Sequence, residues 1–206
     1  MTAVQGTVST GFDVVGEAFA AAFEGLPEMG GALAVHVDGR AVVDLWGGIA
    51  DSRDGRPWER DTPTVVFSCT KGLMSILAAR LVEAGRLDLD RPLADIWPAF
   101  AAHGKDRVSV GDALAHRAGV SAPRVDVTRA QLLDFAAMAQ IVADQEPLWR
   151  PGDGWAYHAL THGWLSGEIV RRAGGVAPGD AFAAMAEAVG GGAWLGMPAE
   201  VTASAA

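Results

Sequence analysis

The N-terminal third of the chain changes from a helical to a strand-like spacing of apolar side chains. Apolar residues recur at helical spacing from about Ser9 to Phe23, which predicts an amphipathic helix. Two apolar runs follow, Gly31 to Val37 and Ala41 to Ile49, and Asp38-Gly39-Arg40 separates them. An Asp-Gly pair between two β-prone runs is typical of a β-hairpin. The pattern therefore predicts one helix followed by two paired strands.

The middle of the chain predicts a loop and then a long helix. The polar segment from Asp51 to Pro63 contains two prolines and is typical of a connection. A leucine recurs at every fourth position from Leu73 to Leu81, which favours a helix from Ser68 to about Ala84 that ends at Gly85.

Short helices broken by glycine and proline are predicted for the rest: Leu93 to Phe100, Val110 to His116, Arg129 to Gln140, Leu160 to Ala173 and Pro178 to Val189. Trp149 to Tyr157 holds Pro151, Gly152 and Gly154 and is interpreted as a loop. A lone hairpin is only marginally stable in water, so further strands are expected beside it, yet no obvious ones follow. The fold class is α+β, with a sheet region over residues 1–67 and a mostly helical region over residues 68–206.

Composition narrows the possible functions. Of the 206 residues, 50% are hydrophobic and 20% are charged, which is typical of a folded globular protein. A formal charge of -9 disfavours nucleic acid or an anionic membrane as a partner. Cys69 is the only cysteine, so no internal disulfide can form. Met1 to Val15 lacks the pattern of a signal peptide, and no apolar run reaches the length of a membrane span, so a cytoplasmic location is expected.

Ser68-Cys69-Thr70-Lys71 is a Ser-x-x-Lys sequence at a predicted helix start. Residues three apart on a helix share a face, so the Lys71 amine can reach the Ser68 hydroxyl. A serine becomes a good nucleophile when a neighbour takes its proton, and a lysine can do so if its pKa falls below ~10.4. Taken alone the tetrad is a weak signal, because a serine N-cap followed by a solvated lysine looks the same.

The surrounding segments strengthen the catalytic interpretation. Phe67 to Gly72 is followed by Leu81 to Asp90 and then by Leu114 to Val120. This succession resembles the serine β-lactamase and penicillin-binding-protein family, in particular its class C and family VIII carboxylesterase branches, from about Phe12 to Pro198. The resemblance implies a β-lactamase-like fold, in which helices pack on an antiparallel sheet beside a helical region. It also implies that Ser68 is the nucleophile and Lys71 its base.

A second family motif, Tyr-x-Asn, corresponds to Tyr157-His158-Ala159. The resemblance implies that Tyr157 passes the proton to the leaving group, whereas the alternative is a loop tyrosine that packs over the core. Ala159 replaces the family's asparagine, which disfavours β-lactam hydrolysis and suits the esterase branch. Trp149 and Trp155 flank this loop and are candidates for an acyl pocket, although packing in the core or the loop is the commoner role of such residues.

The family's third motif, a strand with Lys-Thr-Gly or an equivalent, has no counterpart after Tyr157, and the C-terminal strands of the family are missing. The expected activity is hydrolysis of a short-chain carboxylester through an acyl-enzyme. The alternatives are a truncated, catalytically impaired remnant and a β-lactam or small-amide hydrolase or penicillin-binding protein. An unpaired sheet edge would also favour self-association.

The histidines are weaker candidates. His158 and His162 lie four residues apart and could share a helix face as metal ligands, but no third ligand is close in sequence. The resemblance implies a structural role for His116 in its turn. No dinucleotide or phosphate-binding fingerprint occurs, so neither a metal nor a cofactor is expected.

Overall fold

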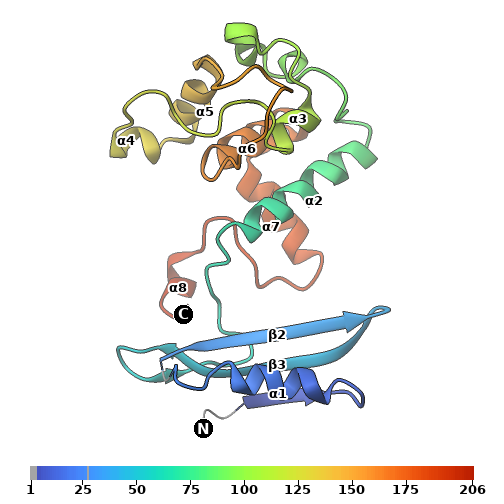
Figure 1. Ribbon diagram of the computed structural model, residues 1–206, viewed down its shortest axis with the longest axis vertical. Coiled ribbons are helices and arrows are strands. Elements are labelled where there is room, and N and C mark those ends of the chain that lie inside the picture. Colours follow the sequence, from blue (N-terminus) through green and yellow to red (C-terminus); the bar gives the residue numbers. More distant parts are fainter. Residues whose placement is uncertain (1–3, 27) are drawn as a thin grey trace. The chain divides into compact units, whose positions relative to one another are not determined.

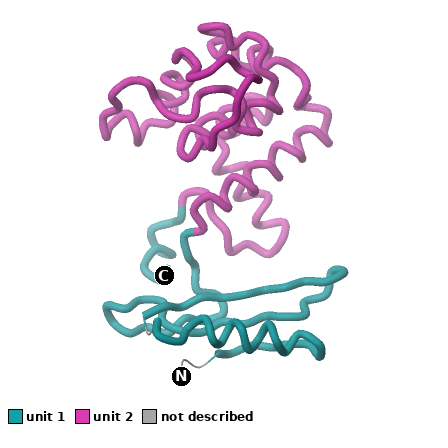
Figure 2. Tube along the Cα trace, in the orientation of Figure 1, with its two compact units in different colours: residues 1–65, 197–206 teal, residues 66–196 magenta. Residues whose placement is uncertain are grey.

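The computed structural model describes residues 4–26 and 28–206, which form two compact units (Figure 2). Unit 1 comprises residues 1–65 and 197–206, and unit 2 comprises residues 66–196. The sequence placed this boundary between residues 67 and 68 and assigned the C-terminal tail to the helical region. In the structure the tail instead packs with the sheet. Residues 1–3, part of the segment interpreted as lacking a signal peptide, lie outside the described residues.

Unit 1 is built on an antiparallel sheet with the strand order β1-β3-β2. The long strands β2 (Gly30–Val37) and β3 (Arg40–Asp51) are the predicted hairpin, and Asp38 and Gly39 turn it with φ values of 48° and 75°. Positive φ at both turn residues matches the right-handed twist of the two strands. The hairpin prediction is confirmed.

Two strands lie at positions that the sequence did not predict. β1 (Val4–Val8) pairs with β3, and the short β4 (Arg56–Pro57) pairs with the far end of β3. Further strands beside the hairpin were expected, but their positions were not, and β4 lies within the segment interpreted as a loop, so that interpretation was wrong at Arg56 and Pro57. β1 was not recognisable from the hydrophobic pattern, because only its end residues Val4 and Val8 are partly buried and the positions between them include the polar residues Gln5 and Thr7.

Helix α1 (Asp13–Ala21) contacts β1 and β3 (Figure 1). Gly16 makes this close approach possible, because a Cβ atom there would lie 3.1 Å from the Val8 side chain. On β3, Val43 and Leu45 are buried. The predicted helix from Ser9 to Phe23 is present but shorter at both ends.

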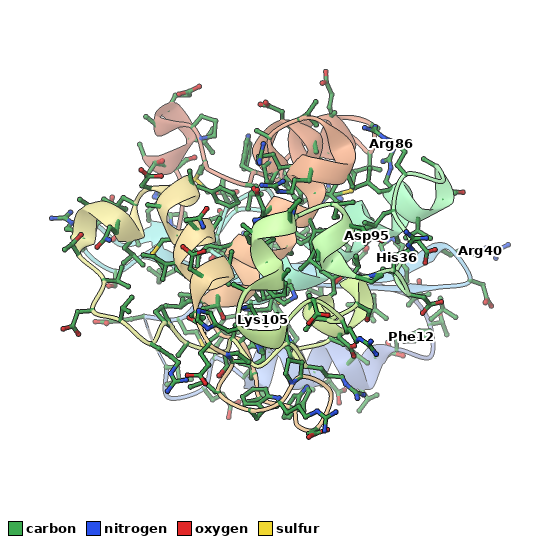
Figure 3. The ribbon with its side chains drawn as sticks, turned by 90° about the horizontal axis from the view of Figure 1, so that it is seen from above. Phe12, His36, Arg40, Arg86, Asp95 and Lys105 are labelled. Atoms are coloured by element: carbon green, nitrogen blue, oxygen red, sulfur yellow. The ribbon has the colours of Figure 1, made fainter. Side chains whose placement is uncertain are left out.

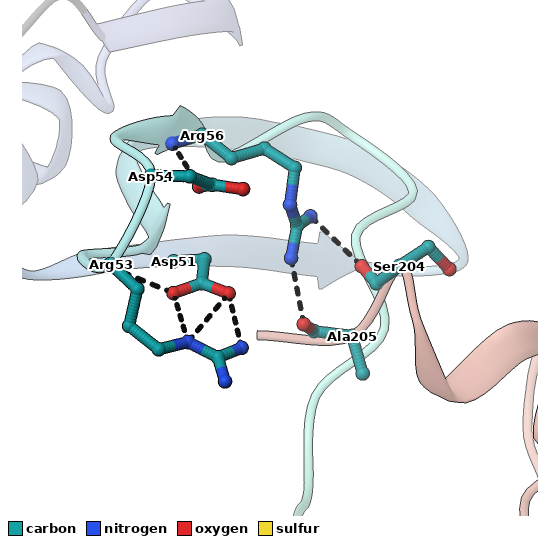
Figure 4. Close-up of polar contacts among 6 residues, drawn as sticks. All are labelled: Asp51, Arg53, Asp54, Arg56, Ser204 and Ala205. Atoms are coloured by element: carbon teal, nitrogen blue, oxygen red, sulfur yellow. Dashed lines mark hydrogen bonds and ion pairs between the residues drawn. The ribbon is translucent and has the colours of Figure 1, made fainter.

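Polar contacts hold the C-terminal tail in unit 1 (Figure 4). The Arg56 guanidinium donates to the carbonyl oxygens of Ser204 and Ala205 at 3.0 and 2.8 Å. The Ala206 N–H donates to the Pro63 carbonyl at 2.8 Å, and the tail contains the short helix α8 (Ala199–Thr202), which the sequence did not predict. Nearby, Arg53 pairs with Asp51.

Unit 2 is helical. Its elements are α2 (Cys69–Glu83), η1 (Leu93–Asp95), η2 (Pro98–Gly104), α3 (Val110–Leu114), α4 (Arg129–Leu132), α5 (Phe135–Asp144), α6 (Thr161–Gly174) and α7 (Pro178–Glu187). Helix α6 is the central element, because it contacts α2, α3, α5 and α7 and is buried without interruption from Leu165 to Val170. No helix in the described ranges is both long and apolar enough to cross a bilayer.

One predicted helix is two in the structure. Arg129 to Gln140 was expected to be continuous, but α4 ends at Leu132 and Asp134 caps α5 by accepting the Ala137 N–H at 3.0 Å. Asp side chains compete with the helical backbone for hydrogen bonds, and here that competition starts a new helix.

Candidate active site

Ser68 is the N-cap residue of α2, but its hydroxyl does not cap the helix. It has helical backbone angles, with φ of -73° and ψ of -6°, and makes no side-chain bond to the first turn of α2. A capping serine instead has extended angles and accepts an N–H from that turn. The geometry therefore argues against the simple N-cap interpretation, and the hydroxyl is available for other contacts.

The Ser68 hydroxyl contacts the Lys71 amine instead. Lys71 lies one turn along α2, and its Nζ donates to Ser68 Oγ at 3.1 Å and to the Ala159 carbonyl at 2.8 Å. Within the described residues, no carboxylate forms an ion pair with Lys71. The amine is thus aimed at the serine by a backbone oxygen.

Tyr157 lies beside this pair, in the loop that the sequence predicted. Lys71 Nζ is 4.8 Å from the centre of the phenol ring. Hydrogen bonding to the Ser68 hydroxyl, and then to the Lys71 ammonium, lowers the pKa of the Tyr157 phenol. Tyr157 is 47% exposed and Ser68 is also exposed, so a small molecule can reach both hydroxyls.

The residue before the serine is strained. Phe67 has φ of 43°, in the left-handed region that bulky residues avoid, and it is 82% exposed. The strained turn is closed by the Cys69 and Thr70 N–H groups, which donate to the carbonyls of Val66 and Phe67 at 3.1 Å. Strain of this kind is concentrated at functional sites. Phe67 is not recognisable as a strained residue from the sequence, since nothing in the local pattern signals its backbone angle.

The flanking tryptophans differ from each other. Trp149 is half-buried, packs edge-on against His158 at 6.2 Å, and lies 3.0 Å from where a Cβ atom at Gly154 would be. Trp155 is 67% exposed. Trp149 therefore packs within the loop, whereas Trp155 projects into solvent.

His158 and His162 do not form a metal site. His158 is fully buried, and both its ring nitrogens are engaged, Nε2 by the Val120 N–H at 3.3 Å and Nδ1 by the Ala156 carbonyl at 2.7 Å. Across residues 4–26 and 28–206, no group of three or more potential ligands is placed to hold a metal ion. The two histidines instead pack with His116 beneath Tyr157, at ring separations of 5.3 Å for His116–His158 and 4.8 Å for His116–His162.

A serine hydroxyl, an amine and a phenol of lowered pKa therefore meet on one helix start and one loop, all within unit 2. A family model described as Beta-lactamase matches residues 19–184. The chain belongs to the beta-lactamase family. The resemblance inferred from the Ser-x-x-Lys and neighbouring segments is confirmed, and so is the β-lactamase-like α+β fold.

Members of the beta-lactamase family that are similar to this chain include both esterases and penicillin-binding proteins. "Esterase/beta-lactamase LipL" of Mycobacterium tuberculosis is 42% identical over 168 residues, which are 82% of this chain and 39% of LipL. A solved family VIII carboxylesterase superimposes with a TM-score of 0.93 at 37% identity, over 99% of this chain and 57% of that one.

A penicillin-binding-protein homologue from Caulobacter crescentus gives a TM-score of 0.92 at 38% identity, over 99% of this chain and 55% of that one. The chain thus spans about 39 to 57% of the length of these relatives.

Proposed function

We propose that Ser68, Lys71 and Tyr157 carry out acyl transfer, and that the protein hydrolyses a short-chain carboxylester through an acyl-enzyme. The observation that carries the proposal is the Lys71 Nζ to Ser68 Oγ contact of 3.1 Å, made by a serine that does not cap its helix. The names of the relatives, an esterase/beta-lactamase and a family VIII carboxylesterase, support a hydrolase of this kind.

In the proposed reaction, the Lys71 ammonium first gives a proton to solvent, and the free amine then takes the proton of Ser68 as Oγ attacks the ester carbonyl carbon. The Tyr157 phenol gives its proton to the alkoxide as the C–O bond breaks, which leaves an acylated serine and a free alcohol. Water then attacks the acyl group, and Tyr157 takes the proton of that water. Lys71 then returns its proton to Ser68 Oγ as the bond between Oγ and the acyl carbon breaks, which frees the carboxylic acid and returns the site to its starting state.

A β-lactam is the second candidate substrate, because LipL carries both activities in its name. The acylation step is the same for either substrate, with the lactam C–N bond breaking in place of the ester C–O bond. Ala159 contributes only a methyl group at the position of the family's asparagine, so the ester stands first.

The test is to react the protein with a fluorophosphonate and to map the adduct by mass spectrometry. We expect the label on Ser68, loss of label and of p-nitrophenyl acetate hydrolysis in Ser68→Ala, and full labelling in Cys69→Ala, which removes the neighbouring exposed thiol. Tyr157→Phe keeps the ring and should lower kcat by roughly 10²–10⁴. An adduct on another residue, or unchanged hydrolysis in Ser68→Ala, would contradict the proposal.

A further inference from the structure

The loop that carries Tyr157 is fastened at each residue around the tyrosine. The Ala156 N–H donates to the His116 carbonyl at 3.4 Å, and the Ala156 carbonyl faces His158 Nδ1 at 2.7 Å. The His158 N–H donates to His116 Nδ1 at 3.1 Å. The Ala159 carbonyl accepts from Lys71 Nζ at 2.8 Å. His116 is thus bonded to the residues on both sides of Tyr157.

These contacts fix the protonation of the histidine rings. His116 Nδ1 accepts an N–H and therefore carries no proton, which makes His116 a neutral ring with its proton on Nε2. His158 Nε2 accepts the Val120 N–H, so its proton lies on Nδ1 and is donated to the Ala156 carbonyl. His162 Nε2 faces the Leu114 carbonyl, which can only accept, so that nitrogen carries the proton.

The surroundings of His116 oppose its protonation. The loop brings Tyr157 and His158 to it, α6 brings His162, and α2 brings the Lys71 ammonium. Burial, and then the electrostatic effects of His158 and Lys71, lower the pKa of His116. Burial lowers the pKa of His162 to about 4.

His116 holds this place at a conformational cost. Its φ of 65° lies in the left-handed region, which is unfavourable for a residue other than glycine. The ring packs 5.0 Å from the Tyr157 ring, and its Nδ1 meets the loop backbone. A strained residue that makes two such contacts is typical of a positioning role.

We propose that His116 is a positioning residue, whose neutral Nδ1 fastens the Tyr157 loop against Lys71 and Ser68. The catalytic consequence rests on the proposed function, whereas the fastening is a property of the loop alone. Protonation of His116 converts its Nδ1 from an acceptor into a donor, which then faces the His158 N–H, and the hydrogen bond between the two is lost. The loop is therefore released when the pH falls through the pKa of His116, and Tyr157 then leaves the lysine.

Tyr157 is the only tyrosine among 206 residues, so its titration can be followed directly. Tyrosine labelled with ¹³C at Cζ gives one resonance for the whole protein. The matched variants are His116→Asn, whose Oδ1 can replace Nδ1 as acceptor and which tolerates positive φ, and His116→Gly, which tolerates positive φ but has no acceptor.

We expect the Tyr157 pKa to lie below its usual value of ~10 in the parent and in His116→Asn, and to return to ~10 in His116→Gly. Ester hydrolysis should lose kcat with little change in KM in His116→Gly and recover in His116→Asn. Equal Tyr157 pKa values in the parent and in folded His116→Gly would overturn the proposal.

The response of the Tyr157 Cζ resonance at acidic pH gives a second test, which does not require His116→Gly to fold. In the parent, the Cζ resonance should move as the pH falls below ~6.5, and this step should be absent in His116→Asn. The same step in both proteins would assign it to another histidine and overturn the proposal. Failure of Ser68 to react with a fluorophosphonate, with both titrations as expected, would reject the catalytic function and leave the fastening intact.

Discussion

Lys105 is a fully buried lysine whose amine donates to carbonyl groups. It directly follows η2 (Figure 3), and its Nζ donates to the Ala102 carbonyl at 2.7 Å and to the Gln145 carbonyl at the end of α5. Burial lowers the pKa of Lys105 to about 8, with a smaller opposing effect from Asp144. Below that pH the folded protein keeps a charge in its interior, which two carbonyl dipoles, the Phe100 ring and, at longer range, Asp144 compensate.

The unfolding free energy should therefore depend on pH through Lys105. Between about 8 and 10.5 the unfolded state holds a proton on this lysine that the folded state has lost, so stability rises with pH across that window. We expect the free energy of unfolding of the parent minus that of Lys105→Met to increase by about 3 kcal/mol between pH 7.5 and 10.5.

Urea unfolding at several pH values measures this difference, and the subtraction cancels the other titrating groups. Lys105→Arg is the matched control, because its charge persists over the whole window and should leave no such increase. A parent-minus-methionine difference that stays constant with pH would contradict the prediction.

Single residues also show how far the sequence predicts the site. Ser68, Lys71 and Tyr157 were predicted from a Ser-x-x-Lys spacing that is weak by itself and from the resemblance of the surrounding segments to a known family, and the structure brings the three residues together. The Ala159 carbonyl was missed, because a backbone group leaves no mark on the sequence. His158 and His162 were considered only as metal ligands and His116 only as a structural residue of its turn, since spacing along the chain does not show that His116, far away in sequence, packs against both.

At the scale of the elements, Gly119 lies in the turn after α3, at the point where this turn contacts the loop that leads to Tyr157. Its φ is +77°, and a Cβ atom there would lie 2.9 Å from the Trp149 carbonyl oxygen and 2.9 Å from Pro147. The Leu148 N–H donates to the Gly119 carbonyl at 2.7 Å, which holds the two segments together. Only glycine satisfies both the backbone angle and the close approach.

Gly119→Ala should consequently destabilise the protein more than its backbone angle alone requires. Gly104 is the matched control, because its φ is +78° and nothing lies within 4 Å of its Cβ position. Gly104→Ala should cost about 1–2 kcal/mol from the left-handed angle, and Gly119→Ala about 1–3 kcal/mol more from the clash. Thermal and urea unfolding of both variants measure the loss in the free energy of unfolding. An equal loss in the two variants would contradict the prediction, because it would show that the loop moves away from the added Cβ atom without cost.

Element boundaries were harder to predict than element types. The hairpin and the long helix carry strong local signals, an Asp-Gly turn and a regular leucine spacing, and both were predicted. The break between α4 and α5 depends on whether Asp134 accepts a backbone N–H, a competition that residue type alone does not decide. β1 is held by its pairing with β3, and a strand formed by long-range pairing needs no apolar alternation of its own.

For the molecule as a whole, the outer edge of β2 is the surface at which we expect contact with other copies of the chain. β2 pairs with β3 on one side, and no other described strand pairs with its outer edge. Its residues Ala32 and Ala34 are exposed and carry no charge. The opposite edge, β1, is shorter and bears the polar residues Gln5 and Thr7. An uncharged, eight-residue edge is the kind that pairs with another strand.

We therefore expect the 206-residue chain to self-associate through antiparallel pairing of β2 with β2 of a second copy, a contact related by a two-fold axis. Ala34 lies near the middle of β2, so Ala34→Lys would place two like charges across the pair and shift the protein to monomer. Thr7→Lys adds the same charge to the β1 edge and should leave association unchanged. Sedimentation velocity over a concentration series measures both, and hydrogen exchange should show the outward β2 amides protected only in the associated form. A parent that is monomeric throughout, or two lysine variants that behave alike, would show that the edge of β2 is not the contact.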